Sequence, residues 1–258
     1  AGCRMADEGA DVIDVGCEYT RPGSGYVPAD EQIRRTLPVI AALAERIGRT
    51  GPAISIDTRL AAVAGAALDA GATLINDVSA LRDDPELAAL AAARGAGVVL
   101  MHMKGTPADM QNDPAYDGVV AFMLLAALPS GFLADRIDAA CRAGLDRQRL
   151  IVDPGIGFGK TTAHNLELLG RLAEFRTLGV PIMVGPSRKR FVGEVLGLED
   201  PADRLTGTLA AVAAAVLAGA ELVRVHDVGP ARQVVDLCAA IRDAAIAGRK
   251  PVRETPTC

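Results

Sequence analysis

The sequence predicts an α/β protein, specifically a (β/α)8 TIM barrel that lacks its first β-strand. Short apolar runs alternate with helix-like segments at an average repeat of roughly 35 residues. The length of 258 residues favours a barrel over a doubly wound sheet. Seven apolar runs are present instead of eight. Residues 1 to 9 resemble the end of a first helix, so we expect the eighth strand to precede Ala1.

The apolar runs are short and continuous, as in parallel strands that are buried on both faces. The predicted strands are Val12–Val15, Ala53–Ile56, Leu74–Ile75, Val98–Met101, Leu150–Val152, Ile182–Val184 and Leu222–Val225. All but the second follow a glycine that ends a helix-like segment, where the missing Cβ permits a left-handed conformation. These glycines are Gly9, Gly71, Gly95, Gly144, Gly179 and Gly219.

The glycine-rich and proline-rich stretches are only long enough for loops. We therefore expect one domain over residues 1–258, with a polar tail from about Gly248. Because half of the residues are apolar, the composition excludes general disorder. The net charge of −5 provides no basic surface for a nucleic acid. No apolar run reaches the roughly 18 residues that a membrane span requires.

The cysteines favour a reducing compartment. Five are present, widely spaced and never in a CxxC pair, so neither a disulfide framework nor a zinc site is indicated. The chain shows no secretion signal at its start. We expect a cytoplasmic protein.

Polar residues follow the predicted strands at their carboxyl ends. In barrel enzymes this rim holds the active site, and polar groups there need partners or a ligand. These residues are Asp14, Glu18, Thr20, Arg21, Asp57, Asn76, Asp77, His102, Asp153, Ser187, Arg188, Lys189, Arg224, His226 and Asp227.

Two kinds of side chain meet at this rim. Asp57, Asn76 and Asp153 can hydrogen-bond the edge of a flat heterocycle, because a carboxylate accepts two parallel N–H bonds and an amide both donates and accepts. A cationic set suits phosphate or diphosphate. Its members are Arg21, Lys189, Arg224 and His226. The sequence thus predicts a ring site beside an anion site.

Simpler interpretations stand beside this one. Asp57, Asn76 and Asp153 could instead cap helices. Each histidine could be structural, and Lys189 could belong to a solvated face. The stretch 153–161 resembles a nucleotide-binding P-loop, but only three residues separate Gly155 from the Gly-Lys-Thr at 159–161, where that motif needs four. Lys160 is therefore left out of the site.

At seven strand ends the chain resembles the bacterial dihydropteroate synthase family of pterin-binding enzymes. The matching motifs run in the right order from about residue 9 to residue 242. They are GCEYTRPG (16–23), ISIDT (54–58), INDVS (75–79), LMHM (100–103), VDPGIGFGK (152–160), GPSRK (185–189) and RVHD (224–227). The resemblance implies a (β/α)8 barrel and a transferase of folate biosynthesis. That reaction condenses 6-hydroxymethyl-7,8-dihydropterin diphosphate with 4-aminobenzoate to give 7,8-dihydropteroate and diphosphate.

The resemblance also implies roles for individual residues. Those that would hold the pterin are Asp57, Asn76, Met101, Asp153, Phe158, Lys189 and Arg224. Those that would bind the diphosphate are Arg21, Arg224 and His226. Those that would border the aminobenzoate are Thr20, Pro22, Phe158 and Ser187. The residues predicted to be catalytic are Arg21, Lys189, Arg224 and His226.

The family likeness further implies Mg²⁺ as cofactor and a homodimer. We assign no protein ligand to the metal, because the family's asparagine ligand lies in a first loop without a counterpart here. Two segments depart from the family pattern: Cys17 and Tyr19 replace the usual glycine and serine, and residues 122–131 are dissimilar. No Ser-His-Asp or Cys-His arrangement is evident in the sequence.

Three other functions stay open from the sequence. A Schiff-base aldolase would use Lys189 as its nucleophile. A methyltetrahydrofolate-binding module would share the pterin-reading rim, but it would not need the cations Arg21, Arg224 and His226. A non-catalytic or truncated pterin-binding barrel is the third alternative, since the first strand has no counterpart.

Overall fold

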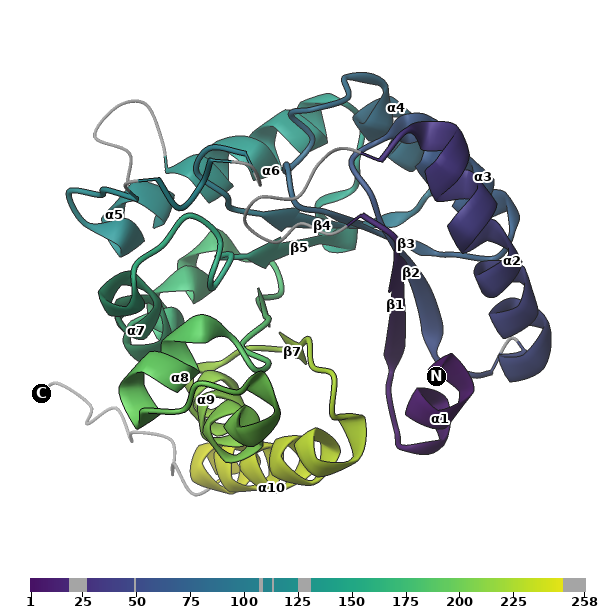
Figure 1. Cartoon of the computed structure of the whole chain (residues 1–258). Helices are drawn as coiled ribbons and strands as arrows, with labels where there is room; N and C mark the ends of the chain where they lie inside the picture. The colour runs from purple at the N-terminus through teal and green to yellow at the C-terminus, as the bar shows by residue number, and fades with distance from the viewer. Residues whose placement is uncertain (19–26, 49, 107–108, 113, 125–130, 248–258) are drawn as a thin grey trace, which may run out of the picture.

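A computed structural model describes residues 1–18, 27–48, 50–106, 109–112, 114–124 and 131–247. Within these residues strands alternate with helices along the chain, as the sequence predicts (Figure 1). All seven predicted strands are present in the described residues, with small differences at their ends. They are β1 (Val12–Gly16), β2 (Ala53–Asp57), β3 (Leu74–Asp77), β4 (Gly97–Met101), β5 (Leu150–Asp153), β6 (Met183–Val184) and β7 (Leu222–Val223).

The helices of the described residues fill the intervals between these strands. They are α1 (Gly2–Asp7), α2 (Ala29–Ile47), α3 (Ala61–Asp69), α4 (Glu86–Arg94), α5 (Val119–Leu124), α6 (Phe132–Arg142), α7 (Thr162–Gly170), α8 (Arg190–Leu196), α9 (Leu205–Ala218) and α10 (Val228–Ala247). Three 3-10 helices also occur there: η1 (Arg147–Arg149), η2 (Leu172–Leu178) and η3 (Pro201–Arg204). The predicted glycine stops are confirmed, because Gly95 and Gly179 end α4 and η2 with φ of 60° and 65°.

The strands form a curved parallel sheet that is not closed into a ring. β1 to β5 pair in chain order, and β6 pairs with β7. A single parallel bridge between Val152 and Ile182 joins the two groups. Among the described residues no strand pairs with the free edges of β1 and β7, which lie apart in Figure 1. The opening lies where the expected eighth strand would complete the ring.

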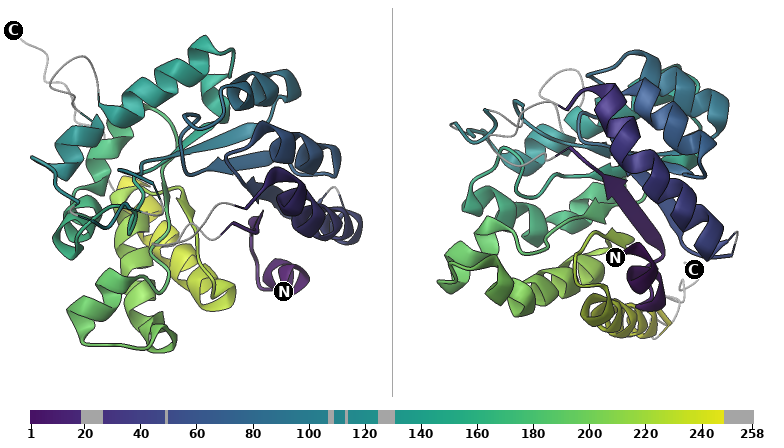
Figure 2. Two further views of the ribbon diagram at one scale, coloured as in Figure 1. Left: turned by 45° about the horizontal axis from the view of Figure 1, so that its top comes forward. Right: turned by 45° about the vertical axis from the view of Figure 1, so that its right-hand side comes forward.

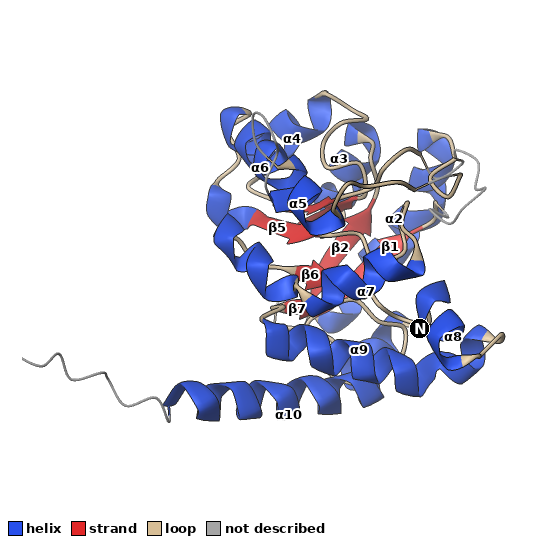
Figure 3. Ribbon diagram, turned by 90° about the vertical axis from the view of Figure 1, so that its left-hand side faces the viewer, coloured by secondary structure: helices blue, strands red, loops and turns tan. Residues whose placement is uncertain are grey.

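Helices cover the outside of the sheet (Figure 2). The large core lies between them and the strands, where Ile56, Ile75 and Leu100 pack fully buried against helix residues such as Leu87 and Ile137. Figure 3 shows α9 and α10 side by side at one end of the molecule. None of the described helices combines the length and the apolar character needed to cross a membrane.

The start of α7 provides a test of local stability. Thr161 accepts a hydrogen bond from the His164 backbone N–H, and the His164 ring accepts one in return from the Thr161 backbone N–H. Thr161→Ala should lower the free energy of unfolding by about 1 kcal/mol, because one N–H at the helix start loses its partner. Urea denaturation measures this difference.

A matched control is Thr177→Ala, because the exposed Thr177 hydroxyl only bonds the carbonyl of Glu174 within η2. This control should change the free energy of unfolding by less than about 0.5 kcal/mol. Equal losses in the two variants would contradict the capping role of Thr161.

Candidate active site

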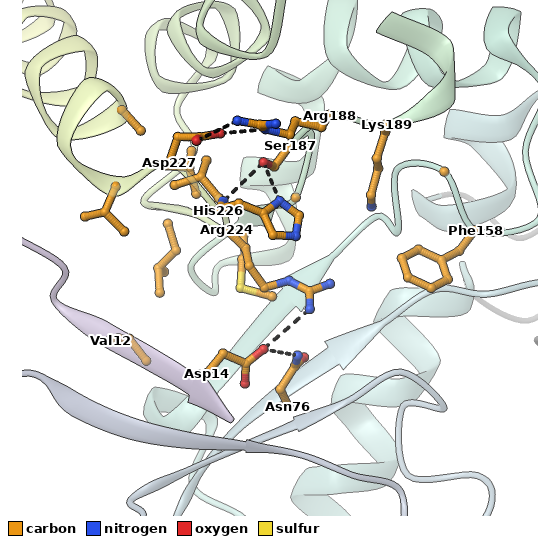
Figure 4. A pocket seen from close by; sticks show the side chains of 18 of the residues that line it. Val12, Asp14, Asn76, Phe158, Ser187, Arg188, Lys189, Arg224, His226 and Asp227 are labelled. Atoms are coloured by element: carbon orange, nitrogen blue, oxygen red, sulfur yellow. Dashed lines mark hydrogen bonds and ion pairs between the residues drawn. The ribbon is translucent and has the colours of Figure 1, made fainter. Parts of the chain in front are cut away.

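The strand register brings the predicted site residues to one face. Val12 and Asp14 of β1, Leu74 and Asn76 of β3, and Arg224 directly after β7 line one cavity. Asp57 lies beside Asn76 in the register of β2 and β3. The cavity has a volume of about 1480 Å³, and its lining extends from residues that precede β1 and β7, such as Gly9 and Glu221, to the loops that follow the strands. Figure 4 shows part of this lining.

A carboxylate and amide cluster occupies the β1 to β3 side. The Asn76 amide donates to Asp14 Oδ2 at 3.0 Å, and Arg224 Nη1 lies 3.4 Å from the same oxygen. Arg224 Nη1 is also 3.5 Å from Asp57 Oδ2. The other oxygen of Asp14 is buried and has no hydrogen-bond partner among the described residues. The cluster therefore retains an acceptor that a ligand N–H could satisfy.

Asp57 is a carboxyl group with a strongly shifted pKa. Burial and the neighbouring Asp14 raise the pKa of Asp57 to about 8, although Arg224 opposes the shift. One guanidinium faces two carboxyl groups here, so it compensates only one negative charge well. Such a shift beside a cavity is typical of functional sites.

The loop after β5 is held tightly against the end of β4. Asp153 Oδ1 accepts the Gly155 backbone N–H at 2.7 Å. Gly155 has a φ of +68°, and a Cβ there would come 1.9 Å from the carbonyl oxygen of His102. Only glycine therefore fits at this turn. Lys160, which the sequence analysis leaves out, donates to the carbonyls of Phe158 and His102 at 2.8 and 3.3 Å.

Lys189 faces this loop across the cavity. Its ammonium lies 4.6 Å from the centre of the Phe158 ring and donates to the carbonyl of Ile156. Burial, followed by the charge of Arg224, lowers the pKa of Lys189 to about 7. The lowered pKa means that burial disfavours the charged form of Lys189 in the free protein. An anion bound nearby would favour the charged form.

The loops after β6 and β7 contact each other through their side chains. Ser187 Oγ lies 2.8 Å from His226 Nδ1, and Arg188 pairs with both oxygens of Asp227 at 2.8 Å. The contact between Ser187 and His226 is one that the sequence does not show. The neighbouring carboxylate of Asp227 pairs with Arg188.

The structure separates the predicted residues into three groups. Those that line the cavity are Asn76, Phe158, Ser187, Lys189, Arg224 and His226. Those that do not line it but lie next to lining residues are Asp57 beside Arg224, Met101 in the cluster with Phe158, and Asp153 near Lys189. Those that fall outside the described residues are Thr20, Arg21 and Pro22.

Residues that flank the undescribed segment 19–26 are held beside β2. Glu18 pairs with Arg59 at 3.0 Å, with their side chains 6% and 3% exposed. The Val27 backbone N–H also donates to Glu18, at 3.4 Å. Residues 18 and 27 therefore meet near the end of β2.

The alternative that Asp57, Asn76 and Asp153 cap helices is wrong. The N-caps of α3 and α4 are Leu60 and Pro85, which make no side-chain cap hydrogen bond, and the N-cap of α7 is Thr161.

Asp14 and Asp227 are site residues that the sequence analysis leaves unassigned. Their position at strand ends was the available signal, but only the folded structure shows Asp14 touching Asn76 and Arg224.

The comparison with family models decides the classification. The model described as pterin binding enzyme matches residues 1–226. The chain belongs to the pterin-binding enzyme family. A member of this family from Synechocystis sp., named dihydropteroate synthase, is 41% identical over 92% of the chain and 79% of that protein. A Haloferax volcanii relative is named probable bifunctional folylpolyglutamate synthase/dihydropteroate synthase. It is 48% identical over 93% of the chain, which spans 27% of that protein.

Solved structures of family members agree with the fold. The dihydropteroate synthase of Xanthomonas albilineans with 4-aminobenzoic acid has a TM-score of 0.85 and 45% identity, over 93% of this chain and 82% of that one. The family prediction and the fold class are thus confirmed, with the sheet left open as described. The predicted dihydropteroate synthase function, a transferase activity, is confirmed by relatives of that name over most of the chain.

Proposed function

We propose that this chain joins 6-hydroxymethyl-7,8-dihydropterin diphosphate to 4-aminobenzoate at the cavity described above. The observation that supports the proposal is that two groups of side chains lie around one cavity. One is the carboxylate and amide cluster on β1 to β3, and the other is the set of cations that follow β6 and β7. Arg224 links the two sides, because its guanidinium reaches Asp14 and Asp57.

The carboxylate and amide side suits the pterin ring. Asn76 and Asp57 would receive the polar edge of the ring, with Asp153 behind them and Lys189 opposite. Asp14 adds a buried oxygen without a partner among the described residues. Phe158 provides an apolar face, and Met101 packs behind it in the small cluster with Val78, Met103 and Met110. The guanidinium plane of Arg224 is suited to stacking on the ring.

The cations suit the leaving diphosphate. In an SN1-like route, the bond between the exocyclic methylene carbon and the diphosphate oxygen breaks, and the electron pair leaves with the diphosphate. Arg224 and His226, with Arg21 from the undescribed segment, would stabilise that charge. The electron-rich dihydropterin stabilises the positive carbon that remains.

The aminobenzoate nitrogen completes the reaction. It attacks the methylene carbon, and the nitrogen afterwards loses one proton to water or to the released diphosphate. The amine is already neutral near pH 7, so no strong base is required. Thr20, Pro22, Phe158 and Ser187 stay the predicted border of the aminobenzoate site, although only Phe158 and Ser187 lie among the described residues.

Mg²⁺ stays a prediction. The described residues contain no cluster of three or more His, Cys, Asp or Glu side chains that could hold a metal ion. These residues therefore do not form a protein cage for the ion, and the steps above use only side chains. A cation carried by the substrate diphosphate is the arrangement consistent with this side-chain set.

A homodimer in the cytoplasm also stays a prediction, as does a single domain over 1–258. Apolar side chains on α9 and α10 support self-association, because Leu217, Leu237 and Ile241 are 50%, 63% and 51% exposed. Light scattering of the purified chain measures the oligomeric state.

The function is tested by product formation. The chain, incubated with both substrates and MgCl₂, should form dihydropteroate and diphosphate in equal amounts, measured by mass spectrometry and a diphosphate-release assay. Omitting aminobenzoate should abolish dihydropteroate. Binding of the pterin diphosphate without any product would support the non-catalytic alternative, and neither binding nor product would contradict the proposal.

A further inference from the structure

Two adjacent side-chain pairs tie the loop after β6 to the loop after β7. Ser187 contacts His226, and Arg188 forms a two-point ion pair with Asp227. The strands themselves pair over only two residues each, Met183 with Leu222 and Val184 with Val223. The two side-chain pairs therefore extend the contact between these segments beyond the strands, into the loops.

The backbone at Arg188 has an unusual conformation that is stabilised by hydrogen bonds. Arg188 has a φ of 53°, in the left-handed region that non-glycine residues rarely adopt. Its N–H donates to Thr208 Oγ1 at 2.8 Å, and Arg204 donates to its carbonyl at 3.2 Å. These bonds stabilise a conformation that places Ser187 and Arg188 against the partner loop.

The hydrogen bonds of Ser187 determine where its proton lies. Ser187 Oγ accepts the backbone N–H of His226 at 3.1 Å and lies 2.8 Å from His226 Nδ1. The serine is only 7% exposed, and in the described part of the chain its hydroxyl proton has no other acceptor than Nδ1. A buried hydroxyl that donates nothing would lose free energy. Donation by the serine to Nδ1 satisfies this proton within the protein.

This donation fixes the tautomer of the neutral imidazole. With Nδ1 as acceptor, the ring hydrogen sits on Nε2. His226 belongs to the cavity wall, and Figure 4 shows its ring between Ser187 and the Arg224 guanidinium. The Nε2–H is thus a donor for an anion in the cavity. His226 is exposed, and its contact with Ser187 restricts rotation of the ring.

We propose that Ser187 is a positioning residue for His226, and that it sets the tautomer and ring orientation with which His226 donates to the substrate diphosphate. The proposal rests on the proposed function for the identity of the anion. It differs from the role that the resemblance implies, in which Ser187 borders the aminobenzoate. Ser187 acts here through His226.

The tautomer can be measured on the resting protein. The chain has three histidines, so a ¹⁵N-histidine NMR spectrum is simple, and His226→Ala assigns the relevant signals. In the wild type the His226 signals should show a hydrogen on Nε2. Ser187→Ala should shift them toward a mixture of tautomers, and Ser187→Thr should restore the wild-type pattern. A hydrogen on Nδ1 in the wild type, or no change in Ser187→Ala, would overturn the proposal.

Kinetics separate the two roles of Ser187. Ser187→Ala should raise KM for the pterin diphosphate by about tenfold, the effect of one lost positioning interaction, and leave KM for aminobenzoate within twofold. In the His226→Ala background the same change should add less than twofold, because the two residues act as a unit. A rise confined to KM for aminobenzoate, or full additivity, would show that Ser187 does not act through His226.

Failure of the proposed function is distinguishable from failure of this inference. If the wild type forms no dihydropteroate, the proposed function is wrong. The NMR result still decides whether Ser187 sets the tautomer of His226.

Discussion

Lys189→Met should lower kcat/KM for dihydropteroate formation by about 100- to 1000-fold, the usual cost of removing one fixed donor from a site of this kind. Methionine keeps much of the side-chain volume but removes the charge and the donors. Lys189 touches the Ile156 carbonyl and the Phe158 ring and lines the cavity. Steady-state kinetics with both substrates, together with calorimetry of the pterin diphosphate, measure the loss.

The chain offers a matched control in Lys104. Its ammonium also donates to a backbone carbonyl, that of Ala115, and lies 4.9 Å from the centre of the Tyr116 ring. Lys104→Met should keep kcat/KM within about threefold of the wild type, since Lys104 is not part of the cavity wall. Equal losses of kcat/KM in the two variants, or unchanged affinity of Lys189→Met for the pterin diphosphate, would show that Lys189 is not part of the site.

Asp57→Asn should weaken pterin binding by about ten- to a hundredfold, because the ring loses a carboxylate acceptor. It should also change how stability depends on pH. The pKa of Asp57 is raised to about 8 by burial and by Asp14. The folded state therefore holds a proton that the unfolded chain releases above about pH 4.

The sign of the stability effect follows from this difference. Between about pH 4 and pH 8 the folded state binds more protons than the unfolded state at Asp57, so its contribution to stability falls as pH rises. One group contributes at most about 1.4 kcal/mol per pH unit. Asp57→Asn should thus gain stability relative to the wild type as the pH increases from 5 to 8, measured by urea denaturation at each pH.

Asp69→Asn is the control for this experiment. Asp69 is exposed and pairs with Arg94, which lowers the pKa of Asp69. Its variant should show no such gain between pH 5 and pH 8. If the Asp57→Asn and wild-type curves run parallel over that range, the account of the Asp57 environment is wrong.

The sequence predicted the strands because their composition alone identifies them. Short apolar runs correspond to β1 through β7, and all of them except β2 follow a helix-ending glycine. The polar residues after the runs lie where barrel enzymes carry their active sites. Asn76, within β3, and Arg224, directly after β7, line the same cavity. These features depend on local sequence.

The contacts between distant loops could not be predicted in the same way. Ser187 and His226 are 39 positions apart, and so are Arg188 and Asp227. Their pairing depends on the left-handed turn at Arg188, which Thr208 and Arg204 stabilise from α9 and η3. Similarly, the packing of Met101 behind Phe158 is a property of the folded cluster. Nothing local in the sequence shows which polar residue faces the cavity and which supports its neighbour.

The central claim is that one cavity holds the ring and the diphosphate in separate, adjoining subsites. Calorimetric titration of free 6-hydroxymethyl-7,8-dihydropterin and of inorganic diphosphate, each with and without the other, tests it directly. Both should bind at once, with Asp57→Asn weakening only the pterin and His226→Ala only the diphosphate. Mutual displacement of the two ligands, or loss of both in either variant, would contradict the account.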